Sequence, residues 1–218
     1  MDDRSVVTVV IPCRNEEESL PGVLAAIPAG YRRLVVDNGS TDDTAAVARA
    51  HGATVVFESV PGYGSAVHAG IDAAPDGVIA VMDGDGSMDP GELPELVAAL
   101  EHATLVVGRR RPVKGTGWPW HARLGNQAIA WRLRRRLGID VHDIGAMRLA
   151  RRDDLLELAV PDRRSGYPLQ LLVLAAGAGW TVVEKDITYR ERSGGKSKVS
   201  GSVRGTITAV WDFSKVIP

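Results

Sequence analysis

The sequence contains only one cysteine, Cys13, among its 218 residues. An intramolecular disulfide framework is therefore excluded, and the composition suits a protein of the reducing cytosol. A lone thiol of this kind is more often a small buried hydrophobic group than a nucleophile. We interpret Cys13 in that way and not as a catalytic residue.

Long apolar runs are also lacking. No stretch approaches the roughly 20 residues that a helix needs to cross a bilayer, and the first residues, MDDRSVV, do not form a signal-peptide pattern. The formal net charge is −1, whereas nucleic-acid-binding domains are usually basic. We expect a cytoplasmic protein without a transmembrane segment or a nucleic-acid partner. Peripheral contact with the cytoplasmic face of a membrane stays open.

Aromatic residues are few, at 5%, but hydrophobic residues in total make up 44% of the chain. This content supports a packed core, and the length fits one domain. No internal repeat, low-complexity tract or linker divides the sequence. We therefore expect a single domain over residues 1–218.

Apolar strand-like runs alternate with helix-like segments through the first half of the chain. The expected strands are Val6–Ile11, Leu34–Val36, Thr54–Phe57, Val78–Met82 and Leu105–Val107, and the helices between them are Glu16–Ile27, Asp42–His51, Ser65–Ala74 and Gly91–Leu100. The strands are continuously apolar, which is typical of strands buried on both faces. The pattern predicts an α/β fold with a mostly parallel central sheet and helices on both faces.

The second half of the chain is less regular. The expected elements are a loop over Arg109–His121, a basic helix over Arg123–Leu137, a strand and turn over Val141–Asp153, an apolar helix over Tyr167–Ala178 and a strand over Trp180–Tyr189. A last amphipathic helix, roughly Val203–Val216, is too short to span a bilayer. It is expected either to lie in a membrane interface or to pack against the core.

Acidic residues crowd at the end of one strand, where the sequence reads VMDGDGSMDP. Asp83 and Asp85 are two residues apart, so a turn lets both carboxylates face one point, and Gly84 and Gly86 leave room for a diphosphate. Hard cations prefer carboxylate oxygens and share their coordination with substrate phosphates. We expect Asp83 and Asp85 to hold Mg²⁺ or Mn²⁺; the alternative is a solvated acidic turn. Asp89 fits the start of a helix instead.

Asp37 and the glycine-rich turn Gly62–Gly64 follow two other expected strands. Ligands in open α/β sheets bind at the carboxyl ends of the strands. These residues and the acid pair are therefore expected to border one cleft. The Asp37 carboxylate suits hydrogen bonds from either a uracil or a guanine ring, so the choice between UDP and GDP stays open.

Two further segments, IPCRNEEESL at Ile11–Leu20 and VVDNGSTDDT at Val35–Thr44, accompany the acid pair. In these motifs the chain resembles the family-2 inverting glycosyltransferases of GT-A fold. The resemblance implies a single GT-A (Rossmann-like) domain that binds a nucleotide-diphosphate sugar. The residues that it assigns to the nucleotide sugar are Pro12, Asn15, Glu16, Asp37, Gly64, Asp83 and Gly84.

Four later motifs narrow the subfamily. They are VGRR at Val107–Arg110, Arg123, DIGAMR at Asp143–Arg148 and RSGGKSKVSG at Arg192–Gly201. With these motifs the chain is similar to polyprenyl-phosphate (dolichyl-phosphate) sugar synthases. The similarity implies transfer of a hexose from GDP-mannose or UDP-glucose to a polyprenyl phosphate at the membrane surface. It also divides the domain into a nucleotide-sugar-binding half, 1–108, and an acceptor-binding half, 109–218.

Basic residues in the second half suit an anionic acceptor. Arginine binds phosphate oxygens in pairs and lysine supplies a point charge; the alternative is a solvated basic loop. The expected acceptor-phosphate ligands are Arg110, Arg123, Arg148, Arg192, Lys196, Ser197 and Lys198. The expected catalytic residues are Asp85, Arg110, Arg123, Arg192 and Lys198.

Two positions depart from the family pattern. Ser87 stands where the archetype has a glutamine as a further metal ligand, and Gln170 stands where family-2 enzymes commonly place an aspartate base. A phosphate monoester is already ionised near neutral pH and needs positioning more than deprotonation. The missing base therefore supports a lipid-phosphate acceptor. The alternatives are a transferase for a soluble hydroxyl acceptor and a non-catalytic nucleotide-sugar-binding protein.

Membrane contact is expected through the basic segment Trp131–Arg136, together with Trp118 and Trp120. The alternative is that these tryptophans pack against the core. His142 lies beside Asp143 in the sequence, and we interpret it as a structural residue.

Overall fold

A computed structural model of the protein describes residues 6–114, 120–145 and 147–194. Its strands are β1 (Val7–Cys13), β2 (Arg32–Asp37), β3 (Thr54–Phe57), β4 (Val78–Val81), β5 (Leu105–Pro112), β6 (Arg148–Arg151) and β7 (Val182–Tyr189). Its helices are α1 (Leu20–Ala26), α2 (Thr44–Ala50), α3 (Tyr63–Ala73), the 3₁₀ helix η2 (Pro90–Glu92), α4 (Leu93–Ala99), α5 (Trp120–Leu137), α6 (Arg152–Leu158) and α7 (Tyr167–Gly177).

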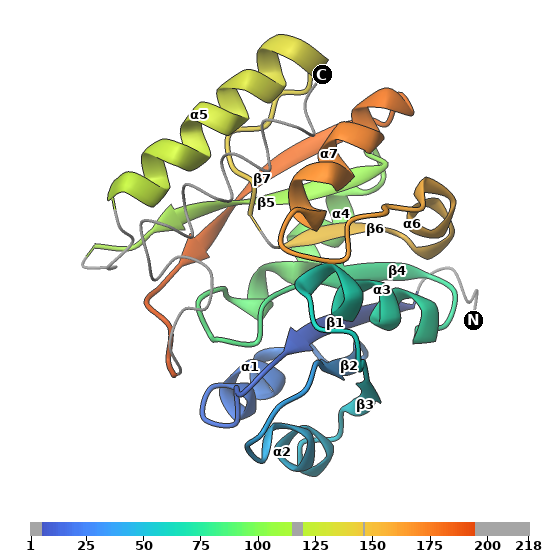
Figure 1. Cartoon of the computed structure of the whole chain (residues 1–218), viewed down its shortest axis with the longest axis vertical. Helices are drawn as coiled ribbons and strands as arrows, with labels where there is room; N and C mark the ends of the chain where they lie inside the picture. The colour runs from blue at the N-terminus through green and yellow to red at the C-terminus, as the bar shows by residue number, and fades with distance from the viewer. Residues whose placement is uncertain (1–5, 115–119, 146, 195–218) are drawn as a thin grey trace.

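The seven strands form one sheet in the order β3-β2-β1-β4-β6-β5-β7 (Figure 1). All neighbouring strands are parallel except that β6 runs antiparallel to both β4 and β5. The mostly parallel α/β fold expected from the sequence is therefore confirmed. The antiparallel strand brings its first residue, Arg148, next to the carboxyl end of β4, where it pairs with Val81.

Two apolar cores cover the two faces of the sheet. On one face, Val10, Val36 and Val81 pack with buried residues of α3, α5, α6 and α7. On the other face, residues such as Val9 and Val35 pack with α1, α2 and α4. Burial on both faces explains why the central strands read as continuous apolar runs.

Most expected elements are present, with shifted ends. The strand Thr54–Phe57 is confirmed residue for residue. The loop expected from Arg109 begins later, because β5 continues to Pro112 and pairs with β7 from Leu105↔Val182 to Pro112↔Tyr189. Helix α1 begins at Leu20 instead of Glu16. The short helix α6 was not expected at all.

Several expectations fall outside the described residues. These are the roles of Trp118, Lys196, Ser197 and Lys198 and the last helix over Val203–Val216. Within the described part of the chain, no helix has both the length and the apolar character that crossing a membrane requires.

Candidate active site

Hydrogen bonds join the loop that follows β1 to the loop that follows β2 at the carboxyl ends of these strands. Asn15, at a positive φ of 55°, accepts a hydrogen bond from the Thr41 amide at 2.8 Å, and its own amide donates to Ser40 Oγ at 3.0 Å. The Glu16 amide donates to Thr44 Oγ1 at 2.9 Å. These bonds hold the IPCRNE segment as a loop at the sheet edge, ahead of α1, which begins at Leu20.

Asp37 and Asn38 have different tasks at the end of β2. Asp37 is 5% exposed, and its Oδ1 accepts the Ser40 amide at 2.8 Å. The Asn38 side chain donates to the carbonyls of Glu58 and Val60 and accepts the Gly62 amide. Asn38 therefore holds the turn before α3, and Asp37 remains the candidate for a nucleotide contact.

The acid pair lies directly after β4. Asp85 is 3% exposed, and its Oδ1 accepts the Ser87 amide at 2.9 Å. Its Oδ2 forms an ion pair with Arg192 Nε at 3.0 Å. Burial, and then the charge of Asp85, raises the pKa of Asp83 to about 7, while Arg192 and Arg110 act in the opposite direction. The effect of Asp85 on this pKa indicates that the two carboxylates face a common region.

The arrangement fits a divalent cation. Burial and the charge of Asp85 raise the pKa of Asp83, so a positive charge near the pair is favoured, and a guanidinium already binds Asp85. No cluster of three or more candidate metal-ligating side chains occurs within the described ranges. Mg²⁺ commonly binds through one or two carboxylates and completes its shell with waters and substrate phosphates. Asp83 and Asp85 would be the protein ligands of such an ion.

The glycines around the acid pair are packed against protein on the side that a side chain would occupy. A Cβ on Gly84 would lie 2.7 Å from Cys13 Sγ, and one on Gly86 would lie 2.1 Å from Ser193 Oγ. Gly84 also accepts a hydrogen bond from Ser19 Oγ at 2.8 Å through its carbonyl. Cys13 is buried, as expected, and burial raises the pKa of its thiol.

Gly64 is likewise packed against protein on the side that a side chain would occupy. A Cβ on Gly64 would lie 2.4 Å from the carbonyl oxygen of Asp162, and the Gly64 amide donates to the Arg164 carbonyl at 3.1 Å. The segment that packs on Gly64, residues 162–164, is held in place by Gln170, whose Oε1 accepts the Asp162 amide at 2.6 Å. Gln170 thus holds the turn that covers the start of α3.

The first residues of the RSGG loop dock on the acid pair. The amides of Arg190 and Ser193 donate to the carbonyls of Ser87 at 2.8 Å and Asp85 at 3.1 Å. Arg190 also pairs with Asp89 at 3.0 Å. As expected, Asp89 caps a helix, since its side chain accepts the Gly91 amide at the start of η2. Contacts across more than a hundred residues therefore bring Arg192 beside Asp85.

A basic groove of about 400 Å³ runs between the end of β5 and helix α5. Its lining residues include Arg109, Arg110, Arg111, Arg123 and Arg134, with Asn126, Gln127, Trp131, His142 and Asp143. Of the expected acceptor ligands, Arg110 and Arg123 thus lie in one groove. Arg109, Arg134 and Gln127 were missed, although Arg123, Gln127 and Arg134 share a helix face by their spacing.

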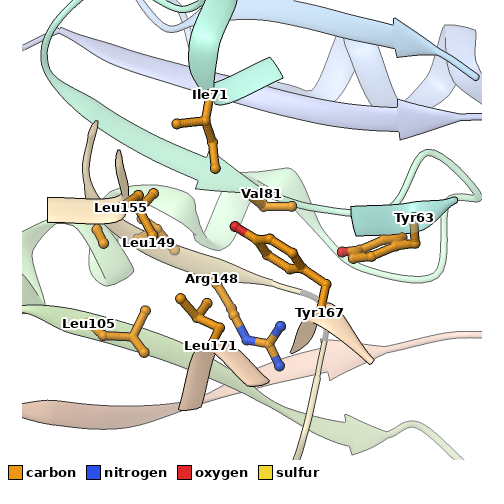
Figure 2. A pocket seen from close by; sticks show the side chains of 10 residues that line it. Tyr63, Ile71, Val81, Leu105, Arg148, Leu149, Leu155, Tyr167 and Leu171 are labelled. Carbon is orange, nitrogen blue, oxygen red and sulfur yellow. The ribbon is translucent and has the colours of Figure 1, made fainter. Parts of the chain in front are cut away.

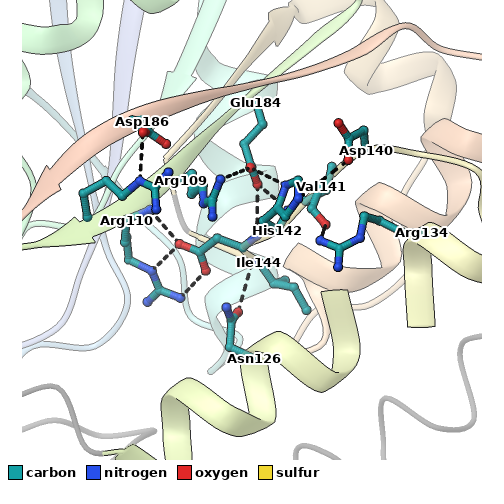
Figure 3. Close-up of polar contacts among 12 residues, drawn as sticks. Arg109, Arg110, Asn126, Arg134, Asp140, Val141, His142, Ile144, Glu184 and Asp186 are labelled. Atoms are coloured by element: carbon teal, nitrogen blue, oxygen red, sulfur yellow. Dashed lines mark hydrogen bonds and ion pairs between the residues drawn. The ribbon is translucent and has the colours of Figure 1, made fainter. Parts of the chain in front are cut away.

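Carboxylates orient the arginines of this groove. The Asp143 carboxylate accepts three hydrogen bonds from Arg110: from the Arg110 backbone amide at 2.7 Å, from Nε at 2.9 Å and from Nη2 at 2.7 Å. Glu184, whose side chain is 8% exposed, pairs with Arg109 at 3.7 Å and accepts the amides of His142 and Asp143 (Figure 3). His142 Nδ1 lies 3.0 Å from Glu184 Oε2, so His142 has the structural contacts that we expected.

Arg148 does not lie in the groove, which corrects its assignment to the acceptor phosphate. Its side chain is 4% exposed and projects to the sheet face where Tyr63 and Tyr167 pack (Figure 2). In β6, Leu149 faces the opposite core. The motif DIGAMR therefore supplies the groove with Asp143 and the interior with Arg148.

The sheet order, with the acid pair at its carboxyl edge and a groove on the side of the later strands, is the arrangement of the GT-A fold. Residues 8–158 match the family model described as Glycosyl transferase family 2, and the chain belongs to this family.

Curated relatives span most of the chain. An uncharacterized glycosyltransferase of Mycobacterium tuberculosis is 68% identical over 97% of both chains. The polyprenol monophosphomannose synthase of Mycolicibacterium smegmatis is 35% identical over 89% of this chain and 81% of its own. The undecaprenyl-phosphate mannosyltransferase of Micrococcus luteus is 34% identical over 91% of this chain and 89% of its own.

Solved structures confirm the fold. A crystal structure of glucosyl-3-phosphoglycerate synthase from Mycobacterium tuberculosis, in complex with Mn²⁺, UDP and glucosyl-3-phosphoglycerate, matches with a TM-score of 0.78. The match covers 98% of this chain and 80% of the synthase at 23% identity. A second crystal structure of that enzyme holds Mg²⁺ and UDP.

Proposed function

We propose that the protein transfers a hexose, with inversion, from GDP-mannose or UDP-glucose to a polyprenyl phosphate. The observation that carries this proposal is the arginine groove beside the acid pair. Arg110, which lines the groove, stacks 5.4 Å from the centre of the Tyr189 ring, and Tyr189 pairs with Met88, shortly after the acid pair, so one end of the groove lies near the candidate metal site. The relatives named as polyprenol and undecaprenyl-phosphate mannosyltransferases support the choice of acceptor.

The two halves of the domain have separate tasks in this proposal. Residues 1–108 bind the nucleotide sugar, with Asp37 at the base or ribose and Asp83 and Asp85 near the diphosphate. Residues 109–218 bind the acceptor. A bound Mg²⁺ or Mn²⁺ supplies charge that neutralises the diphosphate leaving group.

The groove residues position the acceptor for an in-line attack on the anomeric carbon. Arg110 and Arg123 bind the acceptor phosphate, and Asp143 holds the Arg110 guanidinium in one orientation. The phosphate is already anionic, so its oxygen attacks without loss of a proton. Arg192, released from Asp85, would join the phosphates together with Lys198. The inference for Lys198 rests on the family motif alone.

A second candidate is transfer to a small soluble phosphorylated acceptor. The lining of the groove favours it, because its apolar side chains are few, chiefly Pro112 and Trp131. The apolar chain of a lipid acceptor would have to leave the groove a short distance from its phosphate. A hydroxyl acceptor would need a base, so a pH–rate profile with an essential group near neutrality would support this candidate.

Peripheral membrane contact is proposed through the exposed side of α5 at the edge of the groove, which carries Trp131. Trp131 is 53% exposed and Leu124 is 55% exposed, and their spacing of seven residues places them on one helix face. The Arg135 guanidinium stacks 5.2 Å from the centre of the Trp131 ring. An aromatic side chain flanked by arginines suits an interface with anionic lipids.

The test is transfer from radiolabelled GDP-mannose and UDP-glucose to a short polyprenyl phosphate, with 3-phosphoglycerate as the competing acceptor. We expect a lipid-phosphate product with one donor and its loss in Arg110→Ala. A product with 3-phosphoglycerate alone would establish the second candidate. No product with either acceptor, while calorimetry shows nucleotide binding, would indicate a binding protein.

A further inference from the structure

The carboxylate of Glu184, on β7, is contacted by two amides, an imidazole and a guanidinium. Oε1 accepts the amide of His142 at 2.6 Å and that of Asp143 at 3.0 Å. Oε2 lies 3.0 Å from Nδ1 of His142 and 3.7 Å from Nη1 of Arg109. In the sheet, Glu184 pairs with Val107 of β5. The central sheet therefore carries the anchor of all these groups.

The segment that Glu184 holds, residues 141–144, belongs to no helix or strand. Its backbone groups therefore depend on side chains for their hydrogen bonds. Two consecutive amides of the segment use Glu184 as their acceptor. On the side of helix α5, Asn126 Oδ1 accepts the next amide, that of Ile144, at 3.0 Å (Figure 3). The segment is thus fixed between β7 and α5, on the wall of the basic groove.

Two arginines of the groove depend on this anchor. Arg109 reaches Glu184 directly, whereas Arg110 reaches it through Asp143, whose carboxylate accepts three hydrogen bonds from Arg110. The guanidinium is a planar fork that binds two oxygens of a phosphate at once, so its plane must be fixed in advance. Loss of the Glu184 carboxylate frees the backbone of Asp143 and with it the plane of Arg110.

We propose that Glu184 is a positioning residue of the basic groove: it holds Asp143 so that Arg110 presents its guanidinium to the acceptor in one orientation. The consequence for the acceptor rests on the proposed function, whereas the consequence for Arg110 itself does not. A purely local role for Glu184, limited to the stability of residues 141–144, predicts no change at Arg110.

The first test measures how fast the Nε proton of Arg110 exchanges with water, by ¹⁵N NMR of the 218-residue chain, with Arg110→Lys to assign the signal. Arg152 is the internal reference, because its Nε donates to the Ile71 carbonyl at 2.9 Å, outside the groove. Glu184→Ala should accelerate exchange at Arg110 about tenfold, since its local opening becomes easier, and should leave Arg152 unchanged. Equal acceleration at both protons, or none at Arg110, would overturn the proposal.

The conservative variant separates shape from charge. Glu184→Gln keeps an oxygen that can accept both amides, so exchange at Arg110 should stay close to that of the wild type. Acceleration as large as in Glu184→Ala would mean that the charge of Glu184, and not its grip on the Asp143 backbone, controls Arg110, and would contradict the proposal. If Glu184→Ala does not fold, Glu184→Asp replaces it, because its shorter side chain withdraws the carboxylate from the two amides.

Kinetics extend the test to the reaction. Glu184→Ala should raise the KM for the acceptor about tenfold, with the KM for the nucleotide sugar unchanged, and Glu184→Gln should recover most of the acceptor affinity. The double variant with Asp143→Asn should lose less than the product of the two single effects, because both act on Arg110; independent effects would refute the relay. Absence of transfer by the wild type would refute the proposed function alone, and the exchange rates at Arg110 would still decide the positioning role.

Discussion

Arg192 Nε lies 3.0 Å from Oδ2 of Asp85, a residue 107 positions earlier in the chain. The guanidinium thus stands where the proposed cation would bind. A cation and Arg192 compete for this carboxylate, so cation binding requires the arginine to withdraw. The withdrawn arginine is then available to phosphate oxygens.

The competition predicts a gain of cation affinity when Arg192 is neutralised. Arg192→Gln should bind Mn²⁺ alone about tenfold more tightly than the wild type, which equals about 1.4 kcal/mol, since it removes the competing charge. Titration followed by the electron paramagnetic resonance signal of free Mn²⁺ measures this directly. Asp85→Asn is the matched control and should lose Mn²⁺ binding. Weaker binding in Arg192→Gln would mean that the arginine supports the site instead of blocking it.

The packing of Gly84 on Cys13 predicts a steric penalty. Gly84→Ala should lower the free energy of unfolding by about 1–3 kcal/mol, because the new methyl group overlaps Cys13 Sγ. Denaturant unfolding measures the change. Gly22→Ala, in helix α1, adds a methyl group that meets no described atom within 4 Å, and it should be neutral or stabilising by about 0.5–1 kcal/mol. Cys13→Ala should recover part of the Gly84→Ala loss, and strict additivity of the two changes would contradict the contact.

The orientation of Arg110 by Asp143 predicts a specific effect on the acceptor. Asp143→Asn replaces one accepting oxygen with a donor, so the Arg110 fork loses its fixed geometry. The KM for the acceptor should rise about tenfold, which equals about 1.4 kcal/mol, while nucleotide binding stays the same. Asp186→Asn is the control, because its pair with Arg111 is half-exposed and contributes little. Equal effects of both variants would argue against a positioning role.

The capping of η2 by Asp89 predicts that the stability of the fold depends on pH. The Gly91 amide, and more weakly Arg190, lowers the pKa of Asp89 from its ordinary value of 3.8, although burial opposes them. The ionised form is therefore stabilised in the folded state. Its contribution to stability is complete above pH 3.8 and is lost as the pH falls through the lower folded value. Carboxyl-carbon NMR should give a pKa below 3.8, and Arg190→Gln should raise it; a wild-type value at or above 3.8 would contradict the geometry.

The exposed face of α5 predicts lipid dependence. Trp131→Ala should reduce sedimentation with vesicles that contain anionic phospholipid, whereas it should not change unfolding, because the ring is largely exposed. Vesicles of neutral phospholipid are the control and should bind little. Equal binding of wild type and Trp131→Ala would remove this helix from the proposed membrane contact.

The parts of the structure that depend on local patterns were predictable. A run such as Thr54–Phe57 between turn signals forms a strand because β-branched side chains favour it. The acid pair follows the apolar run that became β4, and family motifs named its neighbours. Helix and strand ends were less accurate, because they depend on contacts between distant segments, such as the pairing with β7 that extends β5 to Pro112.

Contacts between distant segments required the fold. Nothing local in DIGAMR states that Asp143 turns to Arg110 while Arg148 turns into the interior. The alternation of side chains along β6 decides the direction of Arg148 once the pairing of β6 with β4 and β5 is set, whereas Asp143, ahead of β6, is positioned by the bond from its amide to Glu184 of β7. The same holds for the two glycines at the acid pair, whose missing side chains make room for Cys13 and Ser193. Apolar periodicity encodes the sheet and its helices, whereas the partner of each charged side chain depends on the three-dimensional register of strands far apart in the chain.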